Sequence, residues 1–279
     1  MKSENQKLVD IAIRWIMFTA SICGMGLAAA LFPIEGNIPF IVIPSILVLL
    51  FSKPVFFEKL KLTTLVTMRI LIVFAALNLF HKQLYVNIIL IMLMINILEA
   101  TLTDIIKYKR YLNGISGIVL TIAVCALSGV WSEAAVVGDF YIVGGVGLAA
   151  SLCYIVAYTI WNWIFVTNEF SSSVAFMHVG FLLAPIFGCI LTLWMGPAAG
   201  FGMWLLLRAD TLAIGGWMQI AAKSWFETEF FSTGFDQFVQ WTKKRNVQFV
   251  LMVVNLILLG YCIYASVCAG TFAFPNIFI

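Results

Sequence analysis

Nine long apolar stretches most constrain how this chain of 279 residues can fold. A helix rises 1.5 Å per residue, so about 20 apolar residues cross the roughly 30 Å hydrocarbon core of a bilayer. Backbone polar groups in lipid must pair within their own segment, so such stretches form helices. We therefore predict an all-α, polytopic integral membrane bundle of about nine transmembrane helices. The predicted spans are Leu8–Phe32, Ile38–Ser52, Leu62–Phe80, Leu84–Asp104, Asn113–Trp131, Phe140–Val166, Val174–Met195, Ala198–Ile220 and Val247–Ala273.

The charge content excludes an ordinary soluble domain. Charged residues make up 10% of the chain and hydrophobic residues 63%, whereas an average soluble domain carries about 25% charged residues. Disordered and collagenous chains are polar or strictly periodic, so they are excluded too. We expect residues 1–279 to form a single transmembrane domain that contacts the lipid bilayer and no nucleic acid.

The second span is the shortest. It contains Pro39 near its start and Pro44 inside it, and eight helices remain if Ile38–Ser52 does not cross. We also expect helix breaks at Pro185 and between residues 196 and 202, where Gly and Pro residues cluster.

Basic residues indicate the orientation, because cytoplasmic loops carry an excess of Lys and Arg. With the N-terminus inside, the inner connections hold twelve Lys and Arg residues and the outer loops hold only Lys82. The sequence therefore predicts a cytoplasmic N-terminus and an outside C-terminus, in the cytoplasmic (plasma) membrane. Residues 221–246 carry aromatic residues at helical spacing and end in Lys243, Lys244 and Arg245, which predicts an interfacial amphipathic helix on the cytoplasmic side.

Five charged residues lie well inside the predicted spans. A charge at the bilayer centre costs roughly 2.5–3.5 kcal/mol on the most lenient scale, so each is a functional candidate by default. Two of them lie near the predicted midplane and the others in the cytoplasmic half, which indicates a polar cavity open to the cytoplasm. They are Arg14, Arg69, Glu99, Arg208 and Asp210.

Polar residues on three predicted helices form stripes, because residues three, four, seven or eleven apart share a helix face. We expect the three stripes to line one pore or pocket. They are Ser151, Tyr154, Tyr158 and Asn162; Asn96, Glu99 and Thr103; and Arg208, Thr211 and Gln219.

The predicted depth of each charged residue in the bilayer suggests its partner. Arg69 and Glu99 lie at similar depth on adjacent spans, so we expect them to pair. Asp210 and Arg208 are two residues apart and therefore point in different directions, so we expect Asp210 to face Asn255 or His178. Asn255 also fits a simple interhelical hydrogen bond.

These observations favour a membrane transporter or channel for a small polar solute or ion, with proton or cation coupling. Glu99, Asp210 and His178 are the expected coupling groups, and Arg208 is the expected counter-charge or anion contact. The full set of predicted binding or coupling residues is Glu99, Asp210, Arg208, His178, Arg69, Asn162, Tyr158, Tyr154 and Asn96.

Two alternatives stay open. Residues 114–117, Gly-Ile-Ser-Gly, resemble the GxSG motif of rhomboid intramembrane proteases, which implies a hydrolase with Ser116 and His178 as a dyad. The chain lacks the Trp-Arg loop motif and the HxxxN helix of that family. In the other alternative, the protein is a structural membrane subunit whose polar residues only join helices.

The sequence predicts no cofactor and no metal. All six cysteines fall inside predicted spans without a CxxC pair, as expected for small packing residues. No span contains a lysine that could form a retinal Schiff base, and His81 and His178 are the only histidines.

Overall fold

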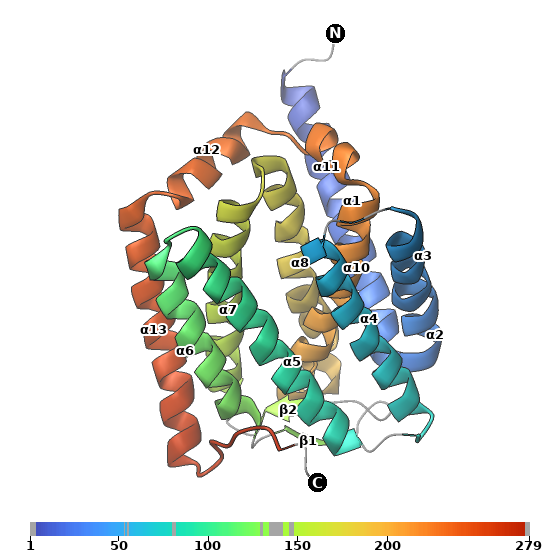
Figure 1. The fold of residues 1–279 in the computed structure, drawn as a ribbon, viewed down its shortest axis with the longest axis vertical. Helices are drawn as coiled ribbons and strands as arrows, with labels where there is room; N and C mark the ends of the chain where they lie inside the picture. Colours follow the sequence, from blue (N-terminus) through green and yellow to red (C-terminus); the bar gives the residue numbers. More distant parts are fainter. Residues whose placement is uncertain are drawn as a thin grey trace. The chain divides into compact units, whose positions relative to one another are not determined.

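The computed structural model describes residues 4–52, 54, 56–79, 82–128, 131–133, 142–144 and 148–276, which are almost entirely helical (Figure 1). Six of its helices are long and apolar enough to cross a membrane, and Tyr111–Ala126 is a shorter apolar helix. This confirms a helical bundle with the composition of an integral membrane protein. The six are Gln6–Leu31, Pro33–Phe51, Asn87–Lys107, Leu148–Glu169, Ser172–Leu191 and Arg245–Cys268.

The chain divides into two compact units, each assembled from separate parts of the sequence. Unit 1 comprises Met1–Leu79, Phe170–Thr192 and Met203–Val239, and unit 2 comprises Phe80–Glu169, Leu193–Gly202 and Gln240–Ile279. The single domain over residues 1–279 stays a prediction.

In unit 1, α10 packs against α1, α3, α4 and α8, and α1 also packs along α8 (Figure 1). The close approach of α10 to α8 depends on Gly215, where an added Cβ would lie 2.7 Å from the Phe181 ring. The helices of this unit are α1 (Glu4–Leu31), α2 (Pro33–Asn37), the π-helical η1 (Ile38–Val42), α3 (Ile43–Phe51), α4 (Phe56–Ala76), α8 (Ser172–Leu191), α10 (Trp204–Ala221), α11 (Lys223–Glu229) and most of α12 (Thr233–Thr242).

The predicted second span is helical from residue 33 to residue 51, with a π-helical segment, η1, in its middle. Pro44 follows this segment and has no N–H to offer the carbonyl of Phe40 four residues earlier. Trp217 Nε1 on α10 donates to that carbonyl at 3.1 Å. A side chain of a neighbouring helix thus satisfies the group that the proline leaves free.

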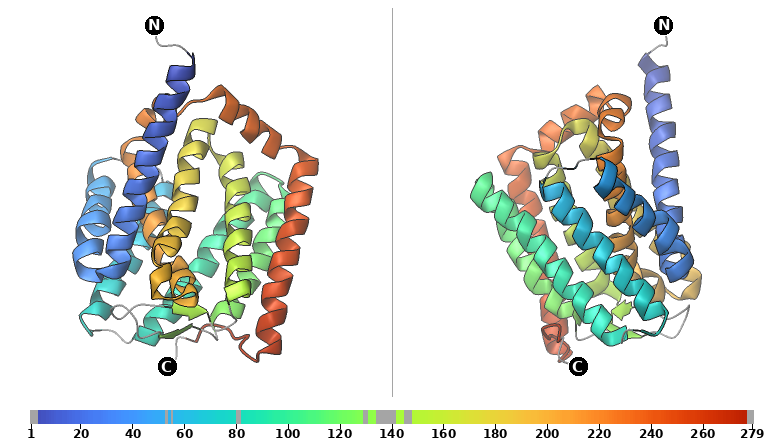
Figure 2. Two further views of the ribbon diagram at one scale, coloured as in Figure 1. Left: turned by 180° about the vertical axis from the view of Figure 1, so that it is seen from behind. Right: turned by 45° about the vertical axis from the view of Figure 1, so that its right-hand side comes forward.

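In unit 2, α13 (Arg245–Cys268) runs along α6 (Tyr111–Ser128) and α7 (Leu148–Glu169), and α5 (Lys82–Leu102) packs on α6 (Figure 2). The buried residues of α13 recur every three or four positions, as expected for one face of a helix. They are Gln248, Met252, Asn255, Leu259, Cys262 and Ser266. The unit also contains the π-helical η2 (Thr103–Lys107), η3 (Leu193–Met195) and α9 (Pro197–Gly202).

Several predicted span ends are wrong. Helix α4 ends at Ala76 rather than at Phe80, α8 at Leu191 rather than at Met195, and α13 at Cys268 rather than at Ala273. Helix α6 ends at Ser128 rather than at Trp131, and α7 begins at Leu148 rather than at Phe140. Between them, β1 (Trp131–Glu133) pairs antiparallel with β2 (Ile142–Gly144). Three glycines, at positions 144, 145 and 147, precede α7, and glycine is a poor helix former, which explains the later start.

A break is confirmed at Gly196, which has φ +104° and separates η3 from α9. The predicted span Ala198–Ile220 is not one helix, because α9 and α10 are separated at Met203 and belong to different units. The break expected at Pro185 is absent, since α8 continues past it. Residues 221–246 also form two helices, α11 and α12, rather than one. On α11 and the residue after it, Phe226 and Phe230 are buried, with ring centroids 5.3 and 5.8 Å from that of Phe18 on α1. Ser172 Oγ donates to Asp236, which ties the start of α12 to α8.

Candidate functional site

The candidate site of unit 1 is centred on an ion pair between Arg69 on α4 and Asp210 on α10. Arg69 Nη1 donates to Asp210 Oδ1, and both side chains are 0% exposed. The predicted pairing of Arg69 with Glu99 is therefore wrong. Sequence depth places residues along a helix axis but does not say which helices are neighbours, and Glu99 belongs to unit 2.

Arg208 points to α8 rather than to the ion pair. Its Nη1 donates to the carbonyl of Phe181 at 3.3 Å, and Thr211 Oγ1 lies 3.5 Å from the same oxygen. Pro185 lies four residues after Phe181 and has no N–H to offer that carbonyl. The proline thus provides the acceptor that Arg208 uses, and Arg208 and Asp210 contact different helices, as their spacing predicts.

His178 on α8 pairs with Gln219 on α10 rather than with Asp210. The distance from His178 Nε2 to Gln219 Oε1 is 2.8 Å, and an amide oxygen as acceptor requires the proton on Nε2. Phe170 stacks on the imidazole at 5.1 Å, and Phe181 contacts it edge-on at 5.2 Å. Four of the predicted residues, Arg69, His178, Arg208 and Asp210, therefore lie in the interior of one unit.

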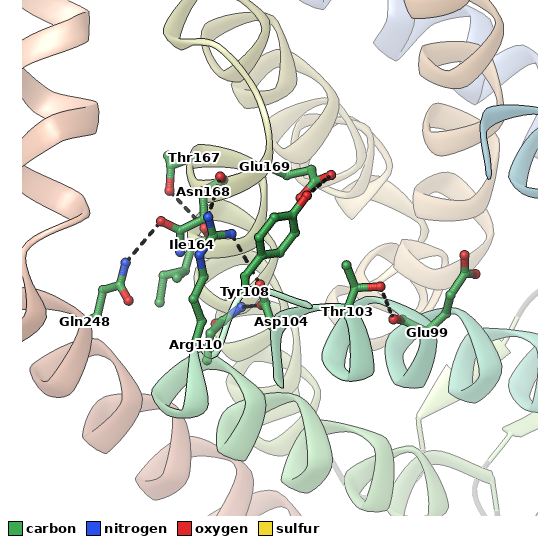
Figure 3. Close-up of polar contacts among 11 residues, drawn as sticks. Glu99, Thr103, Asp104, Tyr108, Arg110, Ile164, Thr167, Asn168, Glu169 and Gln248 are labelled. Carbon is green, nitrogen blue, oxygen red and sulfur yellow. Dashed lines mark hydrogen bonds and ion pairs between the residues drawn. The ribbon is translucent and has the colours of Figure 1, made fainter. Parts of the chain in front are cut away.

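Unit 2 contains a polar cluster at the η2 turn that the sequence analysis did not identify (Figure 3). Asp104 is fully buried, accepts a 2.6 Å hydrogen bond from Asn113 Nδ2, and lies 3.6 Å from the Arg110 guanidinium. Arg110 Nη2 also donates to the carbonyl of Asn168 at 2.9 Å, which joins the start of α6 to the end of α7.

Tyr108 forms the second part of this cluster. Its hydroxyl donates to Glu169 Oε1 at 3.0 Å, and the cationic groups of Arg110 and Lys107 lie 4.3 and 4.6 Å from its ring centroid. Lys109 has φ +57°, a conformation that non-glycine residues seldom adopt. In the sequence these basic residues indicate only the orientation, and no clear pattern there predicts their tight turn.

The remaining predicted residues all belong to unit 2. Tyr154 and Tyr158 are buried with ring centroids 6.4 Å apart, which is typical of side chains on one helix face. Asn96, Glu99 and Asn162 are half-buried. Within the described residues their side chains form no hydrogen bond, and the Glu99 carboxylate points away from the η2 cluster (Figure 3). A single pore lined by all three stripes stays a prediction.

Ser116, the nucleophile of the hydrolase alternative, is fully buried on α6. It belongs to unit 2 and His178 belongs to unit 1, so their pairing stays a prediction.

No protein-family model matches this chain, and neither a characterised protein nor a solved structure is significantly similar to it.

Proposed function

We propose that this protein is a membrane transporter or channel for a small polar solute, with the Arg69–Asp210 pair as its coupling group. The observation that carries the proposal is the complete burial of this pair among apolar helices. Ionisable groups inside a membrane protein are costly, and they commonly mark solute or ion pathways.

The pair suits a coupling role because its strength depends on the charge of Asp210. A proton or a cation bound at Asp210 neutralises the carboxylate and weakens its attraction for Arg69, which loosens the contact between α4 and α10. Arg208 supplies a further positive charge on α10, and the half-buried Glu99 of unit 2 is a second group that can bind a proton or cation.

We further propose nine transmembrane spans, a cytoplasmic N-terminus and a polar cavity open to the cytoplasm, in a plasma membrane. The twelve basic residues on the inner connections support this orientation. A reporter that is active only in the cytoplasm, fused after Ile279, tests it. We expect no signal from that fusion and a strong signal from one at the N-terminus; a C-terminal signal would overturn the topology.

Transport is tested in proteoliposomes incubated with a mixture of small polar metabolites, whose trapped contents are identified by mass spectrometry. We expect Asp210→Asn and Glu99→Gln to abolish accumulation of the solute. Glu229→Gln is the matched control, since Glu229 pairs with Arg14 in the same unit but both side chains are exposed. If every variant accumulates solute like the wild type, the coupling role is wrong and the structural-subunit alternative is favoured.

A further inference from the structure

Four buried side chains in unit 2 carry hydrogen-bonding groups but form no hydrogen bond at all with the described residues. The groups are Thr101 Oγ1 on α5, Ser116 Oγ on α6, Trp161 Nε1 on α7, and both Asn255 Oδ1 and Nδ2 on α13. Each residue is at most 1% exposed. An unpaired buried polar group costs about 1–3 kcal/mol, so four side chains without any hydrogen bond in one helical unit require an explanation.

Two of the four lie beside the same glycine. A Cβ built on Gly117 would lie 2.8 Å from Trp161 Nε1 and closer still to Thr101 Oγ1. The absence of a side chain at Gly117 therefore lets α5 and α7 bring these two groups together against α6. Ser116 is the adjacent residue on α6.

The register of α13 against α7 places Asn255 at the level of Trp161. Gln248, at the start of α13, donates to Asn168 Oδ1 at 3.4 Å, near the end of α7. The two helices are antiparallel, and Asn255 lies seven residues after Gln248, as Trp161 lies seven residues before Asn168. Seven residues advance both helices by the same distance.

The register of α13 against α6 gives the same level for Ser116. Ser266 Oγ, near the end of α13, donates to the carbonyl of Ala126 at 3.3 Å, near the end of α6. These helices are parallel. Eleven residues back from Ser266 is Asn255, and eleven residues back from Ala126 is Ile115, which precedes Ser116. Independent contacts thus bring all four groups to one level of unit 2.

We propose that Thr101, Ser116, Trp161 and Asn255 form a binding site, the unit 2 polar site, for a small uncharged amide or polyol. The indole N–H only donates, the Asn255 amide both donates and accepts, and the two hydroxyls do either. The occupant must therefore carry both donors and acceptors. None of the four side chains is charged, so an ion would lose its hydration without gaining a counter-charge.

Polar residues connect this site to the η2 cluster. Asp104 lies one turn beyond Thr101 on the continuation of α5, and Asn113 lies one turn before Ser116 on α6. Asn113 Oδ1 has no partner among the described residues, and Asp104 lies 3.6 Å from the partly exposed Arg110. These side chains supply hydrogen-bonding groups from the end of unit 2 to the site.

The proposal names a substrate class for the transporter proposed above and rests on that function for transport, but not for binding. Binding of radiolabelled glycerol and urea to the purified full chain in detergent tests it. Four variants each remove the hydrogen-bonding atoms of one residue. Thr101→Val, Ser116→Ala and Asn255→Leu nearly keep the side-chain shape, and Trp161→Phe removes the indole N–H together with part of the ring system. The matched control is Thr121→Val, because Thr121 is also buried on α6 but already donates to the Gly117 carbonyl at 2.9 Å.

We expect saturable binding of at least one probe by the wild type and the Thr121→Val control. Ser116→Ala and Asn255→Leu should weaken it at least tenfold, with an unchanged elution profile on size-exclusion chromatography. The charged analogues acetate and guanidinium should not compete. The site proposal is overturned if neither probe binds saturably, which includes a site filled by water alone, or if Asn255→Leu binds like the wild type.

Failure of the site and failure of the transport proposal are distinguishable. If the wild type and Asp210→Asn bind a probe equally but vesicles accumulate no solute, the site stands and transport is wrong. If vesicles accumulate another solute in an Asp210-dependent way and neither probe binds, transport stands and the site is wrong.

Discussion

Breaking the Arg69–Asp210 pair should destabilise unit 1 more than removing both of its members. Asp210→Leu leaves a fully buried guanidinium without its carboxylate, and Arg69→Met leaves a fully buried carboxylate without its cation. In the double variant Arg69→Met/Asp210→Leu, neither charge is left. The effect of one substitution should therefore depend strongly on whether the other is present.

The burial of the pair determines how much free energy of unfolding each single variant loses. Removing one partner of a buried ion pair typically costs about 3–5 kcal/mol, whereas replacing both by apolar residues of similar volume is often neutral or stabilising. Both side chains here are 0% exposed, so the upper part of this range applies to the single variants. The coupling energy between the two positions should exceed about 2 kcal/mol.

The free energy of unfolding can be measured for all four members of the cycle by SDS titration in detergent micelles. Arg14 and Glu229 provide a matched control in the same unit, because their side chains are 45% and 37% exposed. Glu229→Gln should therefore cost less than about 1 kcal/mol. A double variant that is destabilised by the sum of the two single effects would refute the reasoning.

Three further predictions use thermal melting in detergent. Gly117→Ala should destabilise the protein by about 1–3 kcal/mol, because the added Cβ overpacks against α5 and α7. Gly260→Ala on α13, where a Cβ meets nothing within 4 Å, should stabilise the protein by about 0.5–1 kcal/mol. Equal effects of the two substitutions would contradict the close packing of α5 and α7 around Gly117. Lys109→Gly should stabilise by up to about 1 kcal/mol by relieving φ +57°, and a loss of stability would contradict this. Phe226→Ala should cost about 3–5 kcal/mol, while Trp225→Ala, at a 46% exposed neighbour, should cost far less; similar costs would show that α11 does not pack in unit 1.

The sequence was sufficient to predict the class of the protein and the burial of most of its unusual residues. Apolar stretches predict helices because lipid leaves the backbone no other partner. For the same reason Arg69, Arg208 and Asp210 were expected to be shielded from lipid, and all three are buried. Strand β2 was not predicted, since Ile142–Gly144 is as apolar as the helix that follows.

Contacts between helices were less predictable than burial. The predicted depth of Arg69 in the bilayer was compatible with any acidic residue at a similar depth, and Glu99 on the adjacent predicted span met this condition. The structure instead packs α4 on α10, so Asp210 is the partner. Helical phase gives the direction of a side chain around its own axis, but the neighbouring helix depends on the packing of the whole unit.

For Pro44 and Pro185, the sequence identifies the backbone carbonyl that loses its donor but not the side chain that replaces that donor. Pro44 and Pro185 each identify a carbonyl, four residues earlier, that loses its usual N–H donor. Their donors, Trp217 and Arg208, both lie on α10, although nothing near either proline identifies them. Helix α10 therefore satisfies backbone groups on two other helices and also carries Asp210. A rotation of α10 that separated Asp210 from Arg69 would also strain these two backbone contacts, so the ion pair and the proline carbonyls are coupled through one helix.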